Sequence, residues 1–392
     1  MKNIRFLLWI PIAVITMAML SCSDKAEQII IDPNAEEQIE PLTVTPFDIK
    51  KGVNVSHWLA ASSKRGDERR NFFTQSEVQK LKAMGFDHLR LPVDEEQLFD
   101  KKGVIDEEAL GLLKDCIGWC QTAGMKIIVD MHTLRSHNDK AVNASATGYK
   151  AARRLWLKLA EQEKFRKEWK ILAEELSAYP NDLVAFELLN EPVAPYATQW
   201  NALSANLVRD IRATQPERKL IIGPNGWNNI NQLGTLTLPR KDANIILTFH
   251  FYSPHLLTHY RSEWTGYKDI ACNVNYPGEL ISAEDFNALT KEQQNYIRGQ
   301  VGSYDRKTLE KEIEKAVKRA KELGGVQLYC GEYGCYHYAP RTARIAWTAD
   351  VSSILAAAGI AYSYWEYKGG GYSFCKENGE IANEELYHAI IQ

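Results

Sequence analysis

The sequence lacks several features that would assign it to a particular class of protein. It has no internal repeat and no low-complexity segment, so nothing in it indicates a solenoid or a repetitive linker. Neither sign of charge is in excess: 47 basic and 50 acidic residues leave a net charge of −3, which argues against a nucleic-acid partner. No Cys-x-x-Cys pair or His/Cys cluster has the spacing of a zinc site, and we expect no metal and no cofactor.

The sequence also lacks an apolar run long enough to cross a bilayer comfortably. Its N-terminal run, residues 6–20, is shorter than the roughly 20 residues required and follows the basic residues Lys2 and Arg5. The run ends in Leu-Ser-Cys, which resembles a bacterial lipoprotein cleavage site, with Cys22 as the lipidated first residue of the mature protein. An ordinary secretory signal with an incidental cysteine is the alternative. The prediction is a signal peptide at residues 1–21 and export to the periplasm or cell surface, with a lipid anchor in a bacterial membrane.

Residues 22–46 predict an acidic, flexible tether between the lipid and a folded domain. This stretch contains prolines, few large aromatics and six acidic residues, at positions 24, 27, 32, 36, 37 and 40. We expect the folded domain to occupy residues 47–392.

Short apolar runs alternate with longer helical patterns along that domain. Several of the runs are almost continuously apolar, as strands buried on both faces should be. We predict eight strands, at residues 52–56, 88–91, 126–132, 184–190, 219–223, 244–251, 326–332 and 360–365. We predict helices between them at residues 76–84, 106–122, 162–178, 199–213, 306–323 and 343–358, with Ser76 and Asp106 as N-caps and Gly85, Gly124 and Gly324 after helix ends.

Strands that each lead into a helix or a helical insertion predict a single α/β domain with the architecture of a (β/α)8 TIM barrel. An open, doubly wound sheet is the alternative. The first strand and turn carry no Gly-x-Gly-x-x-Gly sequence, which removes the dinucleotide-binding form of that sheet. Extended loops follow the third strand, at residues 133–161, and the sixth, at residues 253–304. Both leave carboxyl ends of strands, where the active sites of such barrels are built, so either could wall a cleft.

The six cysteines after Cys22 show no readable pairing. Export would permit disulfides, but Cys116 and Cys120 lie four apart in a predicted helix. Their Cβ atoms would then be about 5–6 Å apart, beyond disulfide range. We interpret most of the six as small core residues.

Polar residues at the ends of buried strands need an explanation, because burial costs them hydration. Taken singly, Arg90 could pair with a carboxylate below the site, and His132 could be a core histidine with satisfied hydrogen bonds. A barrel brings strand ends to one mouth, and packing alone explains the whole set poorly. These residues are Arg90, His132, Asn190, Glu191, His250, Tyr252, Glu332 and Trp365.

Glu191 and Glu332 form the candidate catalytic pair. Each follows a predicted strand, and two carboxylates across a barrel mouth can face each other over a glycosidic bond. Hydrolysis requires one of them protonated and the other ionised. A nearby cation such as Arg90 would keep Glu332 ionised, whereas Glu191, shielded and close to that negative charge, would hold the proton. This predicts Glu332 as the nucleophile and Glu191 as the general acid and then base.

The order of these residues resembles glycoside hydrolase family 5, the old cellulase family A, from about residue 47 to the end of the chain. The family has an Arg after its second strand, a His after the third, Asn-Glu-Pro after the fourth, His-x-Tyr after the sixth, a Glu after the seventh and a Trp after the eighth. The matching residues here are Arg90, His132, Asn190-Glu191-Pro192, His250 with Tyr252, Glu332 and Trp365.

The resemblance implies roles for the supporting residues. Asn190 would hydrogen-bond the sugar 2-hydroxyl, and Tyr252 would donate a hydrogen bond to Glu332. His250 would orient the acid/base, and Trp365 would form the floor of the −1 subsite, which holds the sugar whose bond is cut. The carboxyl groups would lie about 5–5.5 Å apart, as in retaining enzymes.

Aromatic and histidine residues near other strand ends are weaker candidates. Trp58 and His57 follow the first strand, and Trp58 resembles family positions that line the glycone side, with His57 as a partner for sugar hydroxyls. Trp227 and Trp264 could contact sugar or pack within their loops.

The predicted function is a retaining, endo-acting hydrolase of β-linked glucan-type polysaccharide or oligosaccharide. Within the family, a β-mannanase, a xyloglucanase or an exo-β-glucosidase is the alternative. A metal-dependent hydrolase using His132, His250, Asp130 and Glu332 is a rival, as is a barrel that binds glycan without cutting it. The His-x-His pair common on the first strand of metal-dependent barrels is missing, and both catalytic carboxylates are present. We expect a monomer whose partners are the glycan and, through the anchor alone, a membrane.

Overall fold

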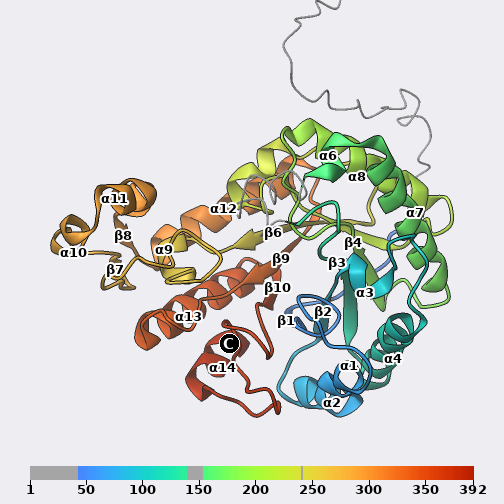
Figure 1. The fold of residues 1–392 in the computed structure, drawn as a ribbon, viewed down its shortest axis with the longest axis horizontal. Coiled ribbons are helices and arrows are strands. Elements are labelled where there is room, and N and C mark those ends of the chain that lie inside the picture. The colour runs from blue at the N-terminus through green and yellow to red at the C-terminus, as the bar shows by residue number, and fades with distance from the viewer. Residues whose placement is uncertain (1–42, 139–152, 240–241) are drawn as a thin grey trace, which may run out of the picture.

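The computed structural model describes residues 43–138, 153–239 and 242–392, and its centre is a closed barrel of eight parallel strands. The strand order is β1-β10-β9-β6-β5-β4-β3-β2, with helices on the outside (Figure 1). This confirms the predicted barrel, and each predicted strand is present. The strands are β1 (Lys51–Asn54), β2 (His88–Val93), β3 (Lys126–Met131), β4 (Val184–Glu187), β5 (Lys219–Ile222), β6 (Ile245–Phe251), β9 (Gln327–Tyr333) and β10 (Ala361–Tyr364).

The barrel has two apolar layers, which explains why its strands are apolar on both faces. Inside the barrel, Ile128, Ile221 and Ile246 pack with Phe47 and Tyr329 in one buried cluster. A larger cluster fills the space between the strands and the surrounding helices. The interior is therefore a packed core, and the polar side chains gather above it at the carboxyl ends of the strands.

The helices begin and end near the predicted positions. Asp106 caps α4 through the Ala109 amide, and Gly85, Gly124 and Gly324 have positive φ as expected. The N-cap of α2 is Thr74 and not Ser76, because the Glu77 carboxylate accepts a hydrogen bond from the Thr74 amide and closes a capping box. The main helices are α2 (Gln75–Ala83), α4 (Glu107–Ala123), α7 (Leu159–Glu175), α8 (Ala197–Arg212), α12 (Arg306–Glu322) and α13 (Arg341–Ala357). Shorter ones are α1 (Asp67–Phe72), α3 (Glu95–Leu98), α6 (Arg154–Leu157), the 3-10 helix η2 (Ile230–Thr235) and α14 (Glu384–Ile391).

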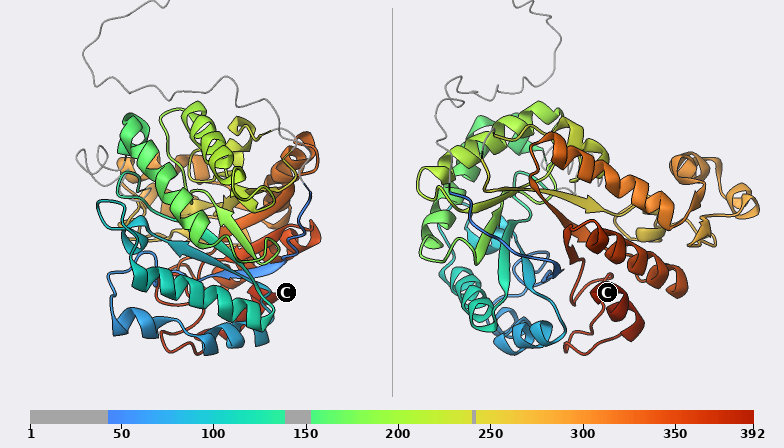
Figure 2. Two further views of the ribbon diagram at one scale, coloured as in Figure 1. Left: turned by 90° about the vertical axis from the view of Figure 1, so that its right-hand side faces the viewer. Right: turned by 180° about the vertical axis from the view of Figure 1, so that it is seen from behind.

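The predicted insertion after β6 forms an arm, defined here as residues 253–304, that projects away from the barrel (Figures 1 and 2). It contains α9 (His255–Thr258), β7 (Gly278–Glu279), α10 (Ala283–Ala288), α11 (Lys291–Ile297), η3 (Arg298–Gln300) and β8 (Ser303–Tyr304). Apolar side chains such as Ile270, Leu280 and Ile297 are fully buried within it. The other predicted insertion, residues 133–161, lies partly outside the described residues.

The end of the predicted tether already belongs to the barrel. The Thr45 amide donates to Asn244 Oδ1 (2.9 Å), and the Asn244 amide group donates to the Thr43 carbonyl (2.8 Å). These bonds hold residues 43–45, the last part of the predicted tether, beside the start of β6. Cys22 and the rest of the tether lie outside the described residues.

The cysteines agree with the prediction of core residues. All six after Cys22 are free thiols; five are buried and Cys272 is partly buried. Within the described part of the chain, no helix is both long enough and apolar enough to cross a membrane.

Candidate active site at the mouth of the barrel

A cleft of about 1120 Å³ opens at the carboxyl ends of the strands, and both predicted catalytic glutamates line it. Glu191 follows β4, and Glu332 lies near the end of β9, on the other side of the mouth. A carboxylate oxygen of each lies within 4.8 Å of one of the other. This spacing is close to the roughly 5–5.5 Å between carboxyl groups in retaining glycosidases and shorter than the 6.5–9.5 Å that admits a water in inverting ones.

His250 lies between the two carboxylates. Its Nδ1 atom is 2.7 Å from Glu191 Oε1 and 3.6 Å from Glu332 Oε2. Burial lowers the pKa of His250 to about 3, so the ring is neutral at pH 7. The amide nitrogen of Asn228 lies 3.4 Å from the other ring nitrogen, Nε2. Since an amide NH2 can only donate, Nε2 is the acceptor and the ring proton is on Nδ1, pointing at Glu191.

Arg90 lies beneath the pair and contacts three carboxylates. Its Nη1 atom is 2.8 Å from Glu332 Oε1, its Nη2 is 3.0 Å from Asp130 Oδ2, and its Nε is 2.7 Å from Glu187 Oε2. The two alternatives drawn from the sequence for Arg90 therefore both occur: it pairs with carboxylates below the site and with the candidate nucleophile. Its Nη2 also donates to Asn190 Oδ1 (2.8 Å), which turns the Asn190 NH2 group toward a ligand as a donor.

The pKa values of the two glutamates that contact Arg90 move in opposite directions. Burial would raise the pKa of Glu332, but His250, Arg90 and His132 and a 2.9 Å hydrogen bond from the Tyr252 hydroxyl outweigh burial and lower it to about 2. Burial and the nearby Asp130 raise the pKa of Glu187 to about 7, against the influence of Arg90. Glu332 is thus the ionised group at neutral pH.

Trp365 and His132 form one wall of the cleft. Their rings are stacked, with centroids 5.4 Å apart and planes inclined by 7°. His132 Nδ1 lies 2.8 Å from Asp130 Oδ2, so Asp130 joins the stacked pair to Arg90. An indole face held in this way suits the C–H face of a pyranose, which is the role that the family resemblance implies for Trp365.

The residues of the metal-dependent alternative do not meet at one point. Asp130 is engaged by Arg90 and His132, whereas His250 faces the two glutamates. In the described part of the chain, the side chains close enough to share one ion are Glu191, His250 and Glu332.

His57 lines the cleft as predicted, but Trp58 does not. His57 Nδ1 lies 3.1 Å from the buried carboxylate of Glu366. Trp58 is fully buried, and its indole nitrogen donates to the Arg69 carbonyl (2.7 Å). His57 has a positive φ, and the reversal of the chain there directs the next side chain into the outer core.

Trp227 and Trp264 both line the cleft and are 41% and 42% exposed. The Trp264 ring rests edge-on against Tyr336, with centroids 5.1 Å apart. Either exposed face is available to a ligand.

A family comparison decides the assignment. The model of the family "Cellulase (glycosyl hydrolase family 5)" matches residues 50–371 of this chain. The chain belongs to glycosyl hydrolase family 5. As a family 5 member it is a cellulase-like, retaining glycosidase that hydrolyses O-glycosyl bonds.

Family 5 relatives match most of the chain. Endoglucanase C of Acetivibrio thermocellus is 29% identical over 350 residues, which cover 88% of this chain and 98% of that protein. Cellodextrinase A of Ruminococcus flavefaciens is 25% identical over 314 residues, covering 80% and 84% of the two chains. The solved structure of Thermotoga maritima Cel5A in complex with cellobiose has a TM-score of 0.69 at 23% identity, covering 88% of this chain and 97% of that one. A structure of the same Cel5A with mannotriose gives the same TM-score and coverage.

Three buried residues belong to this family 5 site but were not predicted from the sequence to be part of it. Glu187 pairs with Arg90, as Glu332 does. Asn228 fixes the tautomer of His250, and the carboxylate of Glu366 contacts the ring of His57. Glu187 ends an apolar strand, which is a readable signal of the kind that pointed to Arg90. Glu366 directly follows the last predicted strand, which is the same signal that pointed to Glu191, whereas Asn228 lies in a loop and gave no comparable signal.

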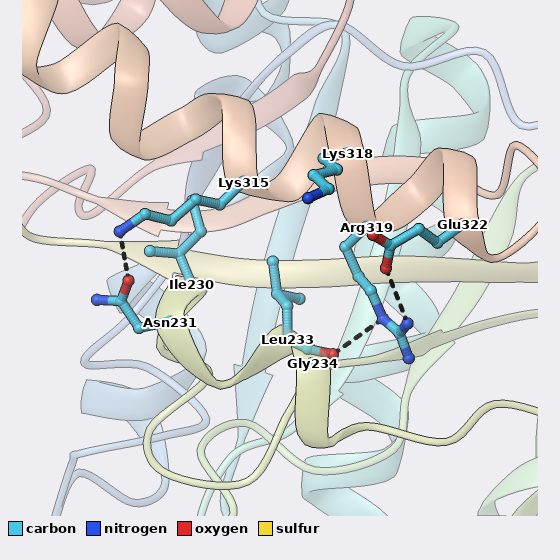
Figure 3. A pocket seen from close by; sticks show the side chains of 8 residues that line it. All are labelled: Ile230, Asn231, Leu233, Gly234, Lys315, Lys318, Arg319 and Glu322. Carbon is cyan, nitrogen blue, oxygen red and sulfur yellow. Dashed lines mark hydrogen bonds and ion pairs between the residues drawn. The ribbon is translucent and has the colours of Figure 1, made fainter.

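A second, smaller hollow lies on the outside of the family 5 barrel, between η2 and α12 (Figure 3). Lys315 Nζ donates to Asn231 Oδ1 (2.6 Å), and Arg319 Nε donates to the Leu233 carbonyl (3.2 Å). These bonds join η2 to α12, and the hollow shares Ile230 and Asn231 with the catalytic cleft but is lined by neither glutamate.

Proposed function

We propose that this chain hydrolyses internal linkages of a β-1,4-glucan with retention of configuration, with Glu332 as nucleophile and Glu191 as acid/base. The observation that carries the proposal is the separation of at most 4.8 Å between one oxygen of each carboxylate. At that distance the nucleophile reaches the anomeric carbon while the acid reaches the glycosidic oxygen of the same bond.

In the first step, Glu332 attacks the anomeric carbon and the bond to the glycosidic oxygen breaks. Glu191 gives its proton to that oxygen, so the leaving sugar departs as a neutral alcohol. In the second step, Glu191 takes a proton from water, the water oxygen attacks the anomeric carbon, and the ester bond to Glu332 breaks. Both carboxyl groups return to their starting states.

The surroundings support this division of roles. Arg90 and Tyr252 hold Glu332 ionised, as a nucleophile must be. The neutral His250 donates to one oxygen of Glu191, which leaves the other oxygen to carry the proton. Gly331, just before Glu332, has no side chain, and a Cβ there would come within 2.9 Å of Thr248 Oγ1 and 3.3 Å of His250 Nε2.

A glucan substrate is supported by the endoglucanases and the cellodextrinase among the relatives. The volume of the cleft, about 1120 Å³, and its lining by residues from both the barrel loops and the arm favour endo action, because several sugars of a chain can be bound at once. β-Mannan is the second candidate, since the similar Cel5A was solved with mannotriose as well as cellobiose.

The test is a panel of β-glucan, cellulose derivative, xyloglucan and β-mannan, with NMR of the anomer first released. We expect the β-anomer from a glucan, and Glu332→Ala should abolish its release. Glu191→Ala should still turn over aryl β-glycosides with good leaving groups, which need no proton, and azide should accelerate that variant. Retained activity in Glu332→Ala would refute the nucleophile assignment, and release of the α-anomer would refute retention.

We also propose that the protein is exported and held on a bacterial membrane through a lipid on Cys22. The support is the short apolar run, its basic start and the cysteine that follows it. Cys22→Ser should move the enzyme from the membrane fraction to the soluble fraction of the producing bacterium. An unchanged distribution would refute the anchor.

A further inference from the structure

Exposed aromatic side chains are concentrated in the catalytic cleft. Across the described ranges, the tyrosine, tryptophan and phenylalanine side chains with more than 40% exposure are Tyr196, Trp227, Trp264, Tyr296 and Tyr338. Three of these line the cleft: Trp227, Trp264 and Tyr296. Exposed aromatics gathered in a groove that also contains polar groups indicate a ligand surface.

Trp227 comes from the loop after β5 and Trp264 from the first part of the arm, whereas Tyr296 comes from a helix farther along the arm, α11. Tyr296 is half exposed at 51%, whereas the next residue, Ile297, is fully buried in the arm. The arm, which projects away from the barrel (Figures 1 and 2), therefore contributes part of the lining of the cleft.

The ring of Tyr296 is held in place from behind. It packs on the backbone of Gly266, where an added Cβ would come within 2.5 Å of the ring. Tyr267 packs against the ring with centroids 5.0 Å apart, and the Tyr267 hydroxyl accepts a 2.5 Å hydrogen bond from Gln300. Gln300 in turn accepts from the Leu256 amide at 2.7 Å, in α9 at the base of the arm. A ring fixed in this way loses little conformational entropy when a ligand stacks on it.

Another part of the cleft lining, at Trp227, lies on the side of the acid/base. The amides of Gly226 and Trp227 both donate to the Pro192 carbonyl, at 2.8 and 3.3 Å, next to Glu191. Beyond Trp227 the lining continues through Asn231, which Lys315 fixes to α12 (Figure 3). Because the acid protonates the leaving group, the sugars beyond Glu191 are those of the aglycone.

We propose that Tyr296 forms a remote aglycone-side subsite, on which a pyranose of a β-glucan chain stacks while the bond between Glu191 and Glu332 is cut. Asn231 and Glu312, which also line the cleft, supply polar groups for the sugar hydroxyls. This inference rests on the proposed function and adds that kcat/KM depends on the length of the substrate. Long chains reach Tyr296, and short oligosaccharides and aryl glycosides do not.

The test compares kcat/KM of the wild type, Tyr296→Ala and Tyr296→Trp on an aryl β-glycoside, on cello-oligosaccharides of increasing length and on soluble β-glucan. Tyr296→Ala should lose about threefold to tenfold on the long substrates, through a higher KM, and nothing on the aryl glycoside. Tyr296→Trp should restore the long-substrate activity. Tyr338→Ala is the matched control, because Tyr338 is equally exposed at 51% but does not line the cleft.

Two outcomes would overturn the subsite. One is an equal loss on all substrate lengths, which would show that Tyr296 only supports the fold. The other is unchanged kcat/KM on the longest chains. A failure of the glucan assignment is seen separately, in the wild type alone, and the length series is then run on whichever β-1,4-glycan the wild type cleaves.

Discussion

The Nδ1 atom of His250 lies 2.7 Å from Oε1 of Glu191, and burial keeps the imidazole uncharged by lowering its pKa to about 3. An uncharged ring that donates to one oxygen of the acid/base orients it without removing its proton. A charged ring in the same place would favour the ionised form of Glu191 and weaken it as an acid. The tautomer depends on Asn228, whose amide nitrogen lies 3.4 Å from Nε2.

Asn228→Asp should convert His250 into a charged ring. A carboxylate beside Nε2 accepts a hydrogen bond from the protonated Nε2–H, which stabilises the charged ring and raises the pKa of His250 from about 3 toward the neutral range. We expect kcat on β-glucan to fall by about 10-fold to 100-fold, with a smaller loss on aryl glycosides whose leaving groups need no acid. Nitrogen NMR of labelled histidine would follow the ring directly. A ring that stays neutral at pH 5 would contradict the account, and Asn229→Asp is the control.

Tyr252→Phe should move the acid limb of the pH profile upward. Glu332 must be ionised to attack, so activity falls as the pH drops through its pKa, which lies at about 2. Removing the 2.9 Å hydrogen bond from Tyr252 raises that pKa, and the acid limb of kcat/KM moves to higher pH. The rate at the optimum should fall by about 10-fold to 100-fold, since hydrogen bonds to charged groups contribute about 1.5–3 kcal/mol. An unmoved acid limb would contradict this role.

Trp58 and Trp227 should respond in opposite ways to substitution. Trp58→Phe removes a buried hydrogen bond and leaves a cavity, so the free energy of unfolding should fall by about 2 kcal/mol with KM unchanged. Trp227→Ala should leave stability unchanged and raise KM for β-glucan about threefold to tenfold, because the exposed ring lines the cleft. Thermal unfolding and steady-state kinetics measure both. A raised KM in Trp58→Phe would contradict this and indicate that Trp58 contacts the substrate in the cleft.

Chelators should leave the activity unchanged, because the chemistry derived above uses only side chains and water. Added Zn²⁺ should inhibit, since Glu191, His250 and Glu332 place ligand atoms within 4.8 Å of one another. The inhibition should be competitive with β-glucan and weaken at low pH, where protons compete for the carboxylates. Loss of activity in EDTA, restored by a metal, would favour the metal-dependent alternative.

The sequence was sufficient to predict the barrel, because several of its strands are buried on both faces and are almost continuously apolar, and they alternate with helical patterns. It also predicted the polar strand ends, since a polar residue such as Arg90 or Glu332 stands out against that background. The pairing of Arg90 with Glu332 followed from charge alone and is found at 2.8 Å.

The positions of side chains that depend on loops were much harder to predict from the sequence. Trp58 follows a strand just as His57 does, and only the backbone turn at His57 sends the two side chains in opposite directions. Asn228 reaches His250 from a loop after a different strand, so no local pattern could connect them. Tyr296 lies far in the sequence from the barrel strands, and only the folded arm brings it to the cleft.

The hydrogen bonds of Thr43 and Thr45 to Asn244 determine how an anchored molecule would be oriented relative to the membrane. Asn244 directly precedes β6, so the N-terminal chain leaves the barrel at the end opposite the two glutamates. From Cys22 to Thr43 is 43 − 22 = 21 residues, which can span at most about 70 Å. In a protein held on this tether, the amino ends of the strands would face the membrane. The catalytic cleft would face away from it, accessible to polymers in the surrounding medium. The enzyme could then cleave only those polymers that come close to the surface of the cell that made it.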